Sequence, residues 1–155
     1  MRFCQLDQIT LLEPGKRIQA TRYLSGKEDY LRDHFPRFAV MPGVMMLESL
    51  FQASALLVRA TDEYRHGVVL MRAAKNVKFA DFVQPGQTLS ITSEIFKQNG
   101  DSYILKALGT KGDSVAVNAR LVVECIPDSD TSPVDQYSSR YMKQLTEQLQ
   151  QAAMA

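Results

Sequence analysis

Apolar and polar residues alternate over long stretches in the second half of the chain, which is typical of half-buried β-strands. In segment 114–126 the apolar face carries Val115, Val117, Ala119, Leu121 and Val123. The other face of that segment carries Asn118, Arg120 and Glu124. Segment 88–96 alternates in the same way, with Leu89, Ile91 and Ile95 opposite Ser90, Thr92 and Glu94. Both segments are therefore predicted to be strands with one buried face.

Turn residues divide this half of the chain into four predicted strands, at 67–83, 89–98, 102–110 and 114–126. The separators are the turns at 84–87 (QPGQ), 99–101 (NGD) and 111–113 (KGD). Residues 3–25 contain two more short runs of strand character around the Pro-Gly turn at 13–16. Such short connections predict a hairpin followed by an antiparallel meander.

One segment differs from all the others, because 43–61 contains no proline and is apolar almost all the way round. Strong helix formers fill it, so we expect a helix enclosed by other structure on most sides. A brief helical turn is expected at 28–32, and Pro36 and Pro42 forbid a continuous helix between them. The sheet must bury its apolar face on something, and this helix is the apolar partner available. The prediction is an α+β fold, a long antiparallel sheet wrapped around one central helix.

The end of the chain differs in composition from the part before it. Residues 128–136 are polar, and 138–155 place Tyr141, Met142, Leu145, Leu149 and Ala152 at helical spacing. We expect one domain at 1–126, followed over 127–155 by a linker and a short amphipathic helix that lies on the domain or on a neighbour.

Composition narrows the classes of function. The 155 residues include 18 basic and 17 acidic side chains, so the net charge favours neither a nucleic acid nor an anionic membrane as partner. The two cysteines, Cys4 and Cys125, belong to no metal or redox motif, and we interpret them as inert thiols. The N-terminus resembles no secretory signal, and the apolar run 38–58 is too broken for a membrane span. We therefore expect a cytoplasmic protein without membrane insertion.

Three features of residues 34–52 suggest chemistry. Glu48 is the one charged side chain in the apolar run, and a carboxylate stripped of water tends to take up a proton, as a general acid requires. Gln52 lies one turn further on, within reach of it. His34 is a candidate base, and the helix start at Gly43 offers free amides to a developing oxyanion. The alternatives are a Glu48 paired inside the core and an ordinary loop histidine. His66, in a polar run, is interpreted as a surface residue without a role.

The stretch HFPRFAVMPGVMMLESLFQ at 34–52 resembles the signature of the 3-hydroxyacyl-acyl-carrier-protein dehydratases, which have the hot-dog fold. Glu48 stands fourteen places after His34, as the family's acidic residue does, and Gln52 matches a family glutamine. LLEPGKRI before the motif and VKFADFVQPGQTL after it extend the resemblance over about residues 3–126.

The resemblance implies a hydro-lyase that converts 3-hydroxyacyl chains on acyl-carrier protein to trans-2-enoyl chains, in fatty-acid or polyketide-like biosynthesis, with no metal or other cofactor. His34 would remove the C2 proton, and Glu48 from the other subunit of a dimer would help to expel the hydroxyl. The Gly43 amide would polarise the thioester carbonyl and the Val40 carbonyl would hold the His34 ring. Family resemblance points to a homodimer, or to a trimer of dimers. The acyl tunnel would pass Met45, Met46, Leu50, Phe79 and Phe82.

Two positions depart from the family pattern, where Arg37 replaces a glycine and Ala39 a proline. Arginine does not readily take positive φ, so the loop would follow another course or Arg37 would face solvent. Arg37 is also a candidate for the phosphopantetheine phosphate or an acidic carrier, as are Lys75, Lys78 and Lys97. A hot-dog thioesterase and a non-catalytic acyl-binding or assembly subunit remain alternative functions.

Overall fold

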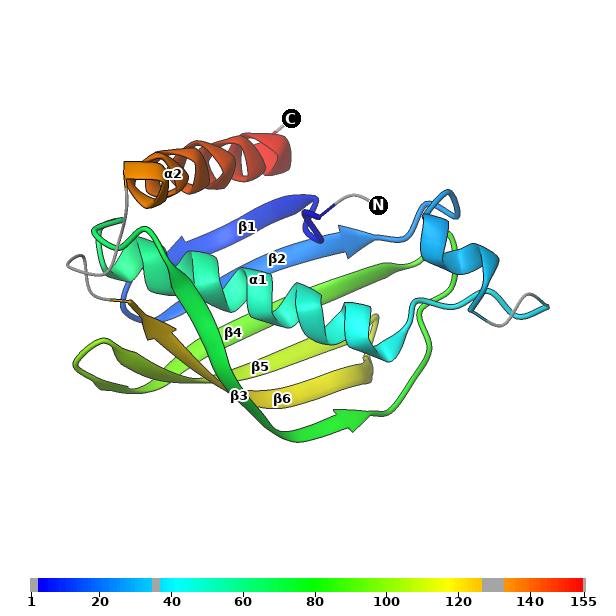
Figure 1. The fold of residues 1–155 in the computed structure, drawn as a ribbon. Helices are drawn as coiled ribbons and strands as arrows, with labels where there is room; N and C mark the ends of the chain where they lie inside the picture. Colours follow the sequence, from blue (N-terminus) through cyan, green and yellow to red (C-terminus); the bar gives the residue numbers. More distant parts are fainter. Residues whose placement is uncertain (1–2, 35–36, 127–132, 155) are drawn as a thin grey trace.

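A six-stranded antiparallel sheet curls around a central helix (Figure 1). The computed structural model describes residues 3–34, 37–126 and 133–154, and the side chains of the last range from residue 137. The strands are β1 (Gln8–Glu13), β2 (Arg17–Tyr23), β3 (Val69–Phe79), β4 (Thr88–Asn99), β5 (Ser102–Lys111) and β6 (Ser114–Cys125). Their order across the sheet is β1-β2-β4-β5-β6-β3. The α+β prediction and the predicted hairpin at the start of the chain are confirmed.

The central helix α1 (Gly43–Thr61) begins and ends where the sequence predicts. It lies in the concave side of the sheet and contacts the five strands β2 to β6. Its buried residues are Met46, Ser49, Leu50, Ala53, Ser54, Ala55, Leu56, Leu57, Val58 and Arg59. By length and composition α1 would suffice to cross a membrane, but 56% of that apolar window is buried in the fold. We therefore describe it as the core helix.

A hydroxyl pair fixes the helix on the sheet. Ser54 donates to the Leu50 carbonyl at 2.7 Å, and its Oγ lies 2.7 Å from Ser93 Oγ on β4. Both side chains are fully buried. Buried hydroxyls without partners would be costly, so this pair favours one position of α1 along β4.

The predicted alternation holds in β4 but fails at the start of β6. Val117, Ala119, Leu121 and Val123 are buried as expected, whereas Val115 is 38% exposed and Ala116 is fully buried. Gly109 pairs with Val117 and Thr110 with Val115, so Ala116 is an extra residue, a β-bulge. A bulge shifts the alternation by one position, and the prediction for Val115 was wrong for that reason.

A long third strand was predicted over 67–83, but β3 ends at Phe79. The amides of Ala80 and Asp81 both turn to the Ala116 carbonyl on the bulge of β6. Within the described residues no strand pairs with the outer side of β3, where Leu70, Met71 and Phe79 are exposed. An unpaired strand edge with apolar side chains is a surface suited to association.

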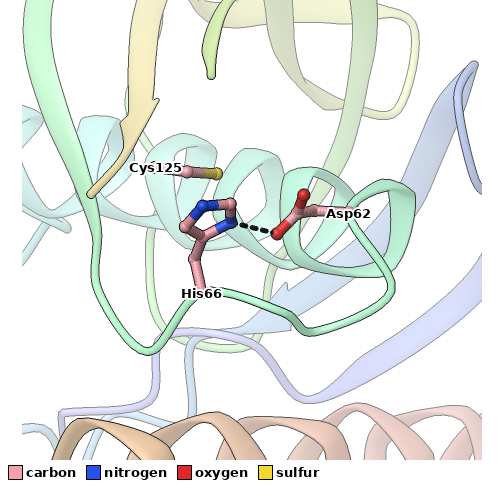
Figure 2. A group of neighbouring side chains, drawn as sticks. All are labelled: Asp62, His66 and Cys125. Carbon is pink, nitrogen blue, oxygen red and sulfur yellow. Dashed lines mark hydrogen bonds and ion pairs between the residues drawn. The ribbon is translucent and has the colours of Figure 1, made fainter. Parts of the chain in front are cut away.

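The loop after α1 contradicts the prediction that His66 is a surface residue. The His66 side chain is only 14% exposed, and its Nδ1 contacts the Asp62 carboxylate at the helix C-cap (Figure 2). Arg59 donates to the carbonyls of His66 and Gly67, at 3.2 Å each, and so holds the loop against the helix. The polar run 61–66 resembles a solvated surface in sequence, but Asp62 and Arg59 hold His66 against the end of the helix.

The C-terminal helix α2 (Pro133–Met154) packs along β1 and touches the end of α1. It is longer than predicted and starts at a proline, which suits the first helical position. Leu149 is buried and Met142 and Leu145 pack on the core, as the helical spacing predicts, but Tyr141 is 53% exposed. Residues 127–132 of the predicted linker lie outside the described residues.

Candidate active site

His34 follows the short 3-10 helix η1 (Asp29–Arg32), whose end places it beside the start of α1. Its amide donates to the Tyr30 carbonyl at 3.2 Å, and its Nδ1 lies 3.1 Å from the carbonyl oxygen of Val40. A carbonyl oxygen only accepts, so Nδ1 carries the hydrogen in this contact and Nε2 of the neutral ring has the lone pair. Val40 is fully buried, which gives the ring a rigid support.

The loop between His34 and α1 contains the two departures from the family pattern. Arg37 is exposed and is not among the residues with positive φ, so it does not take the backbone conformation that a glycine would permit. Ala39 is half-buried against the core. Phe38 packs edge-on against Phe82, with ring centroids 5.6 Å apart. Residues 35 and 36 lie outside the described residues.

The first turn of α1 presents backbone donors. Pro42 caps the helix, and its carbonyl accepts from the amides of Met45 and Met46 at 2.9 and 3.1 Å. In the described part of the chain, the amides of Gly43 and Val44 have no such backbone acceptor. Free amides at the positive end of a helix can stabilise an oxyanion.

The ring of Phe79 packs closely on Gly43. A Cβ on Gly43 would lie 3.0 Å from Phe79 Cε1 and 3.1 Å from Cδ1, closer than ordinary van der Waals contact. The absence of a side chain lets the aromatic ring lie over the start of the helix. The position of the ring over these donors therefore depends on this residue.

Several predicted residues line one open groove of about 350 Å³. Its walls are His34, Met41, Gly43, Met46, Phe79, Ala80, Asp81 and Phe82. The groove thus combines the candidate base, the helix start and three of the five predicted tunnel residues. Met45 is half-buried beside the core and Leu50 is fully buried in it, so neither lines this groove within one chain.

Glu48 is not among the residues that line the groove. It comes five residues after Gly43, which places it about 140° around the helix at about 100° per residue. Glu48 is half-buried rather than enclosed, and its Oε1 accepts from Gln52 Nε2 at 3.0 Å. One chain therefore does not bring His34 and Glu48 to the same groove.

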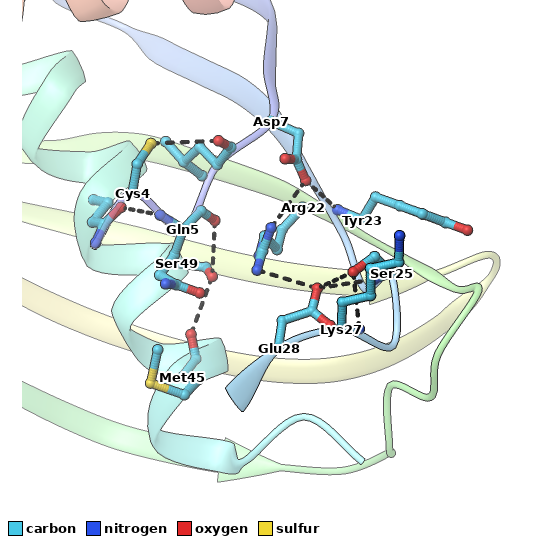
Figure 3. A network of polar contacts seen from close by, with 12 residues as sticks. Cys4, Gln5, Asp7, Arg22, Tyr23, Ser25, Lys27, Glu28, Met45 and Ser49 are labelled. Atoms are coloured by element: carbon cyan, nitrogen blue, oxygen red, sulfur yellow. Dashed lines mark hydrogen bonds and ion pairs between the residues drawn. The ribbon is translucent and has the colours of Figure 1, made fainter. Parts of the chain in front are cut away.

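Gln52 joins Glu48 to the start of the chain. Its Oε1 accepts from the Gln5 amide at 2.6 Å, and its Nε2 donates to the Phe3 carbonyl at 2.7 Å as well as to Glu48. Ser49 adds a bond from the next helix position to the Gln5 carbonyl, at 3.2 Å (Figure 3). The N-terminal segment thus holds the face of α1 that carries the carboxylate.

A second network at the groove was not predicted from the sequence. Asp81 accepts from Ser114 Oγ at 2.7 Å and from the Phe82 amide at 2.7 Å, and Lys111 Nζ lies 3.3 Å from it. The Ser114 bond, the Phe82 amide and Lys111 together lower the pKa of Asp81 below its usual value. Lys111 also donates to the Phe82 carbonyl at 2.7 Å. In the sequence, the one hint of this fixed turn is the aspartate Asp81 followed by Phe82, just beyond the end of β3.

The predicted basic docking residues do not share one element. Lys75 and Lys78 lie on β3 and Lys97 on β4, and these three and Arg37 are all exposed. Their role in carrier binding stays a prediction.

Similarity to known proteins supports the family resemblance of the sequence. A family model described as a FabA-like domain matches residues 1–124. The chain is 34% identical over 116 residues to a 3-hydroxyacyl-acyl-carrier-protein dehydratase FabZ of Levilactobacillus brevis, covering 75% of this chain and 78% of that protein. It is 32% identical over 120 residues to a FabZ of Clostridium kluyveri, covering 77% and 83%.

Solved structures show the same architecture at low sequence identity. One is the dehydratase heterocomplex ApeI:P from Xenorhabdus doucetiae, with a TM-score of 0.67, 15% identity and coverage of 83% and 86% of the two chains. Another is smu.793 from Streptococcus mutans bound to acetyl CoA, with a TM-score of 0.64, 14% identity and coverage of 81% and 92%. These likenesses confirm the hot-dog fold, and the sequence matches show that the chain belongs to the FabA-like family.

Proposed function

We propose that this protein dehydrates 3-hydroxyacyl thioesters carried on acyl-carrier protein to trans-2-enoyl thioesters. The observation that supports it most is the pairing of His34, oriented by the Val40 carbonyl, with the free amide of Gly43 in one groove. The FabZ relatives are named for this activity. We also propose that the reaction takes place in the cytoplasm, in fatty-acid synthesis or a related pathway.

The two groups in the groove suit the first half of the reaction. A proton on the carbon beside a thioester is weakly acidic, so its removal needs a base and stabilisation of the enolate oxygen. His34 Nε2 takes the C2 proton, and the Gly43 amide donates to the thioester oxygen as negative charge develops there. Neither group needs a cofactor for this step.

The second half of the reaction requires an acid at the 3-hydroxyl. Glu48 gives a proton to the hydroxyl, the carbon–oxygen bond breaks and water leaves, while the enolate electrons form the C2–C3 double bond. The proton on His34 then returns to Glu48 through solvent. Gln52 holds the carboxylate from the side opposite the substrate.

Because Glu48 does not line its own chain's groove, the active site we propose contains His34 from one subunit and Glu48 from another. The outer edge of β3, with its exposed apolar side chains, is the surface through which two chains would associate. A symmetric dimer of this kind contains two such sites.

The first experiment is an assay of the product. The purified chain is incubated with a 3-hydroxyacyl-carrier thioester, and enoyl formation is followed by absorbance and by the mass loss of one water. Release of a free acid and a carrier thiol would instead identify a thioesterase. Binding of the acyl carrier without any conversion would identify a non-catalytic subunit.

Complementation tests the composite site directly. His34→Ala and Glu48→Gln variants should each be inactive, while Glu94→Gln, an exposed carboxyl on β4, should keep full activity. After subunit exchange in an equal mixture, half of the dimers are mixed and one of their two sites is intact, so activity should return to about a quarter of the wild-type value. Retained activity in both single variants would refute the assignment, and an inactive mixture that has exchanged subunits would refute the shared site.

A further inference from the structure

Three side chains with metal-binding atoms meet at the C-terminal end of α1. One ligand atom each of Asp62, His66 and Cys125 lies within 4.8 Å of the other two. Figure 2 shows the three side chains converging from the helix C-cap, from the loop after it and from the last residue of β6. Cys125 comes 59 residues after His66 and 63 after Asp62, which is why no spacing motif reveals the cluster.

The cluster is enclosed, and a fourth donor lies beside it. Asp62 is 7% exposed and Cys125 1%. Asp101 Oδ1, in the turn between β4 and β5, lies 3.9 Å from His66 Nε2. The Asp101 carbonyl accepts from the Cys125 amide at 2.9 Å, so this turn is fixed to the end of β6. Sulfur, nitrogen and carboxylate oxygen donors from three segments therefore converge, and the Asp101 carboxylate lies on the Nε2 side of the imidazole ring.

The local charges favour a cation there. Burial together with the Asp62 and Asp101 carboxylates raises the pKa of the Cys125 thiol to about 12. A thiol becomes a zinc ligand when the bound metal ion displaces its proton. Two carboxylates and a thiolate around one divalent cation would leave a small net charge, which the buried Arg59 guanidinium nearby offsets further.

We propose that Asp62, His66 and Cys125 form a zinc site, with Asp101 as the fourth ligand. A mixed set of thiolate, imidazole and carboxylate is typical of tetrahedral Zn²⁺. Binding forms a sulfur–zinc bond and releases the thiol proton to solvent, with no change of oxidation state.

The position of the site indicates a structural role. It joins the end of α1, the β4–β5 turn and the end of β6, directly before the chain leaves for α2. Glu63 and Tyr64, between the two ligands from this loop, both take positive φ, at 57° and 58°. Such a strained pair persists where surrounding contacts fix it. Gly43 lies about 28 Å away along the helix, at about 1.5 Å per residue, so the zinc site does not depend on the proposed reaction.

Cobalt provides the direct test. The full-length chain is stripped with chelator, dialysed and titrated with Co²⁺, and we expect a thiolate-to-cobalt charge-transfer band and the visible bands of tetrahedral cobalt, both removed by Zn²⁺. Cys125→Ser should lose the charge-transfer band, whereas Cys4→Ser, which removes the chain's other thiol, should keep it. No such band in the wild-type chain, or an unchanged band in Cys125→Ser, would overturn the proposal.

A second measurement covers the case in which Cys125→Ser does not fold. Zn²⁺ in excess should raise the midpoint temperature of the stripped wild-type chain and of Cys4→Ser, because a ligand that binds only the folded state stabilises it. His66→Gln retains the thiol but lacks the imidazole, so its rise should be much smaller. An equal rise in His66→Gln would mean that zinc binds elsewhere. No rise in wild type would mean that the cluster is an Asp62–His66 contact beside a buried thiol and does not bind zinc.

Discussion

The two histidines of the chain lie beyond opposite ends of α1, and their surroundings differ in kind. His34 precedes the helix, contacts a backbone carbonyl and lines an open groove beside the first amides of the helix. His66 follows the helix, contacts a carboxylate and lies in a loop that a buried arginine holds closed. At the His34 end of α1, polar groups face a groove that can hold a ligand. At the His66 end, the hydrogen bonds hold the loop against the helix. Changes at the first end should therefore affect turnover, and changes at the second should affect stability.

The largest effect is expected for His34→Ala. Removal of the base should lower kcat by about 10² to 10⁴-fold, the usual contribution of general acid–base catalysis. The thermal midpoint should change little, since the ring is only half-buried. Steady-state kinetics with the carrier substrate and a thermal melt are the measurements. A loss of less than tenfold would contradict the role of His34.

Arg59→Met tests the opposite end. The carbonyls of His66 and Gly67 would lose their buried donors, which should cost about 2 kcal/mol of the free energy of unfolding. Arg140→Met is the control, because Arg140 is exposed on α2, and it should stay within about 0.5 kcal/mol of wild type. Denaturant unfolding measures both. Equal losses of stability in the two variants would contradict the structural role of the His66 end of α1. A large loss of turnover in folded Arg59→Met would contradict it as well.

Gly43→Ala gives a smaller effect at the groove. The new methyl group must displace the Phe79 ring, which is half-exposed and can move, so stability should change by less than about 1 kcal/mol. The altered groove should lower kcat/KM by about tenfold or more, since small misplacements at a reacting centre are costly. Adding Phe79→Ala should recover part of that loss by removing the clash. Unchanged kinetics in Gly43→Ala would show that the ring does not position the substrate.

The smallest effect is a pH dependence from Cys125. Its pKa is about 12 in the folded chain and near 9 in the unfolded chain, so above pH 9 the unfolded state loses a proton that the folded state keeps. Stability is then fully present below pH 9 and falls by at most about 1.4 kcal/mol per pH unit towards pH 12. Metal-free Cys125→Ala should show a shallower fall than metal-free Cys4→Ala in denaturant unfolding between pH 9 and 10.5. Identical slopes would contradict the raised pKa.

The same two ends show what sequence patterns can predict. The bounds of α1 follow from local features, a proline before it and an uninterrupted apolar run within it. The His34–Val40 contact lies within one motif and agrees with what the family resemblance implied. The surface assignment of His66 failed because Cys125 approaches it only through the fold. Val115 failed because a bulge depends on the register with the neighbouring strand. Glu48 is less enclosed than its apolar neighbours indicated, since a single chain leaves that side of α1 partly open.

Gln52 has a practical consequence for work with this protein. Two of its three hydrogen bonds run to backbone atoms of Phe3 and Gln5, and the third runs to the Glu48 carboxylate. An affinity tag joined to the N-terminus, or a truncation there, lies within a few residues of Phe3 and Gln5. Such a change therefore perturbs the hydrogen bonds that support Glu48. Helix α2 packs on β1 instead, and its last described residues, 151–154, are exposed or half-buried. Expression vectors that place the tag after Ala155 are the appropriate choice for kinetic studies.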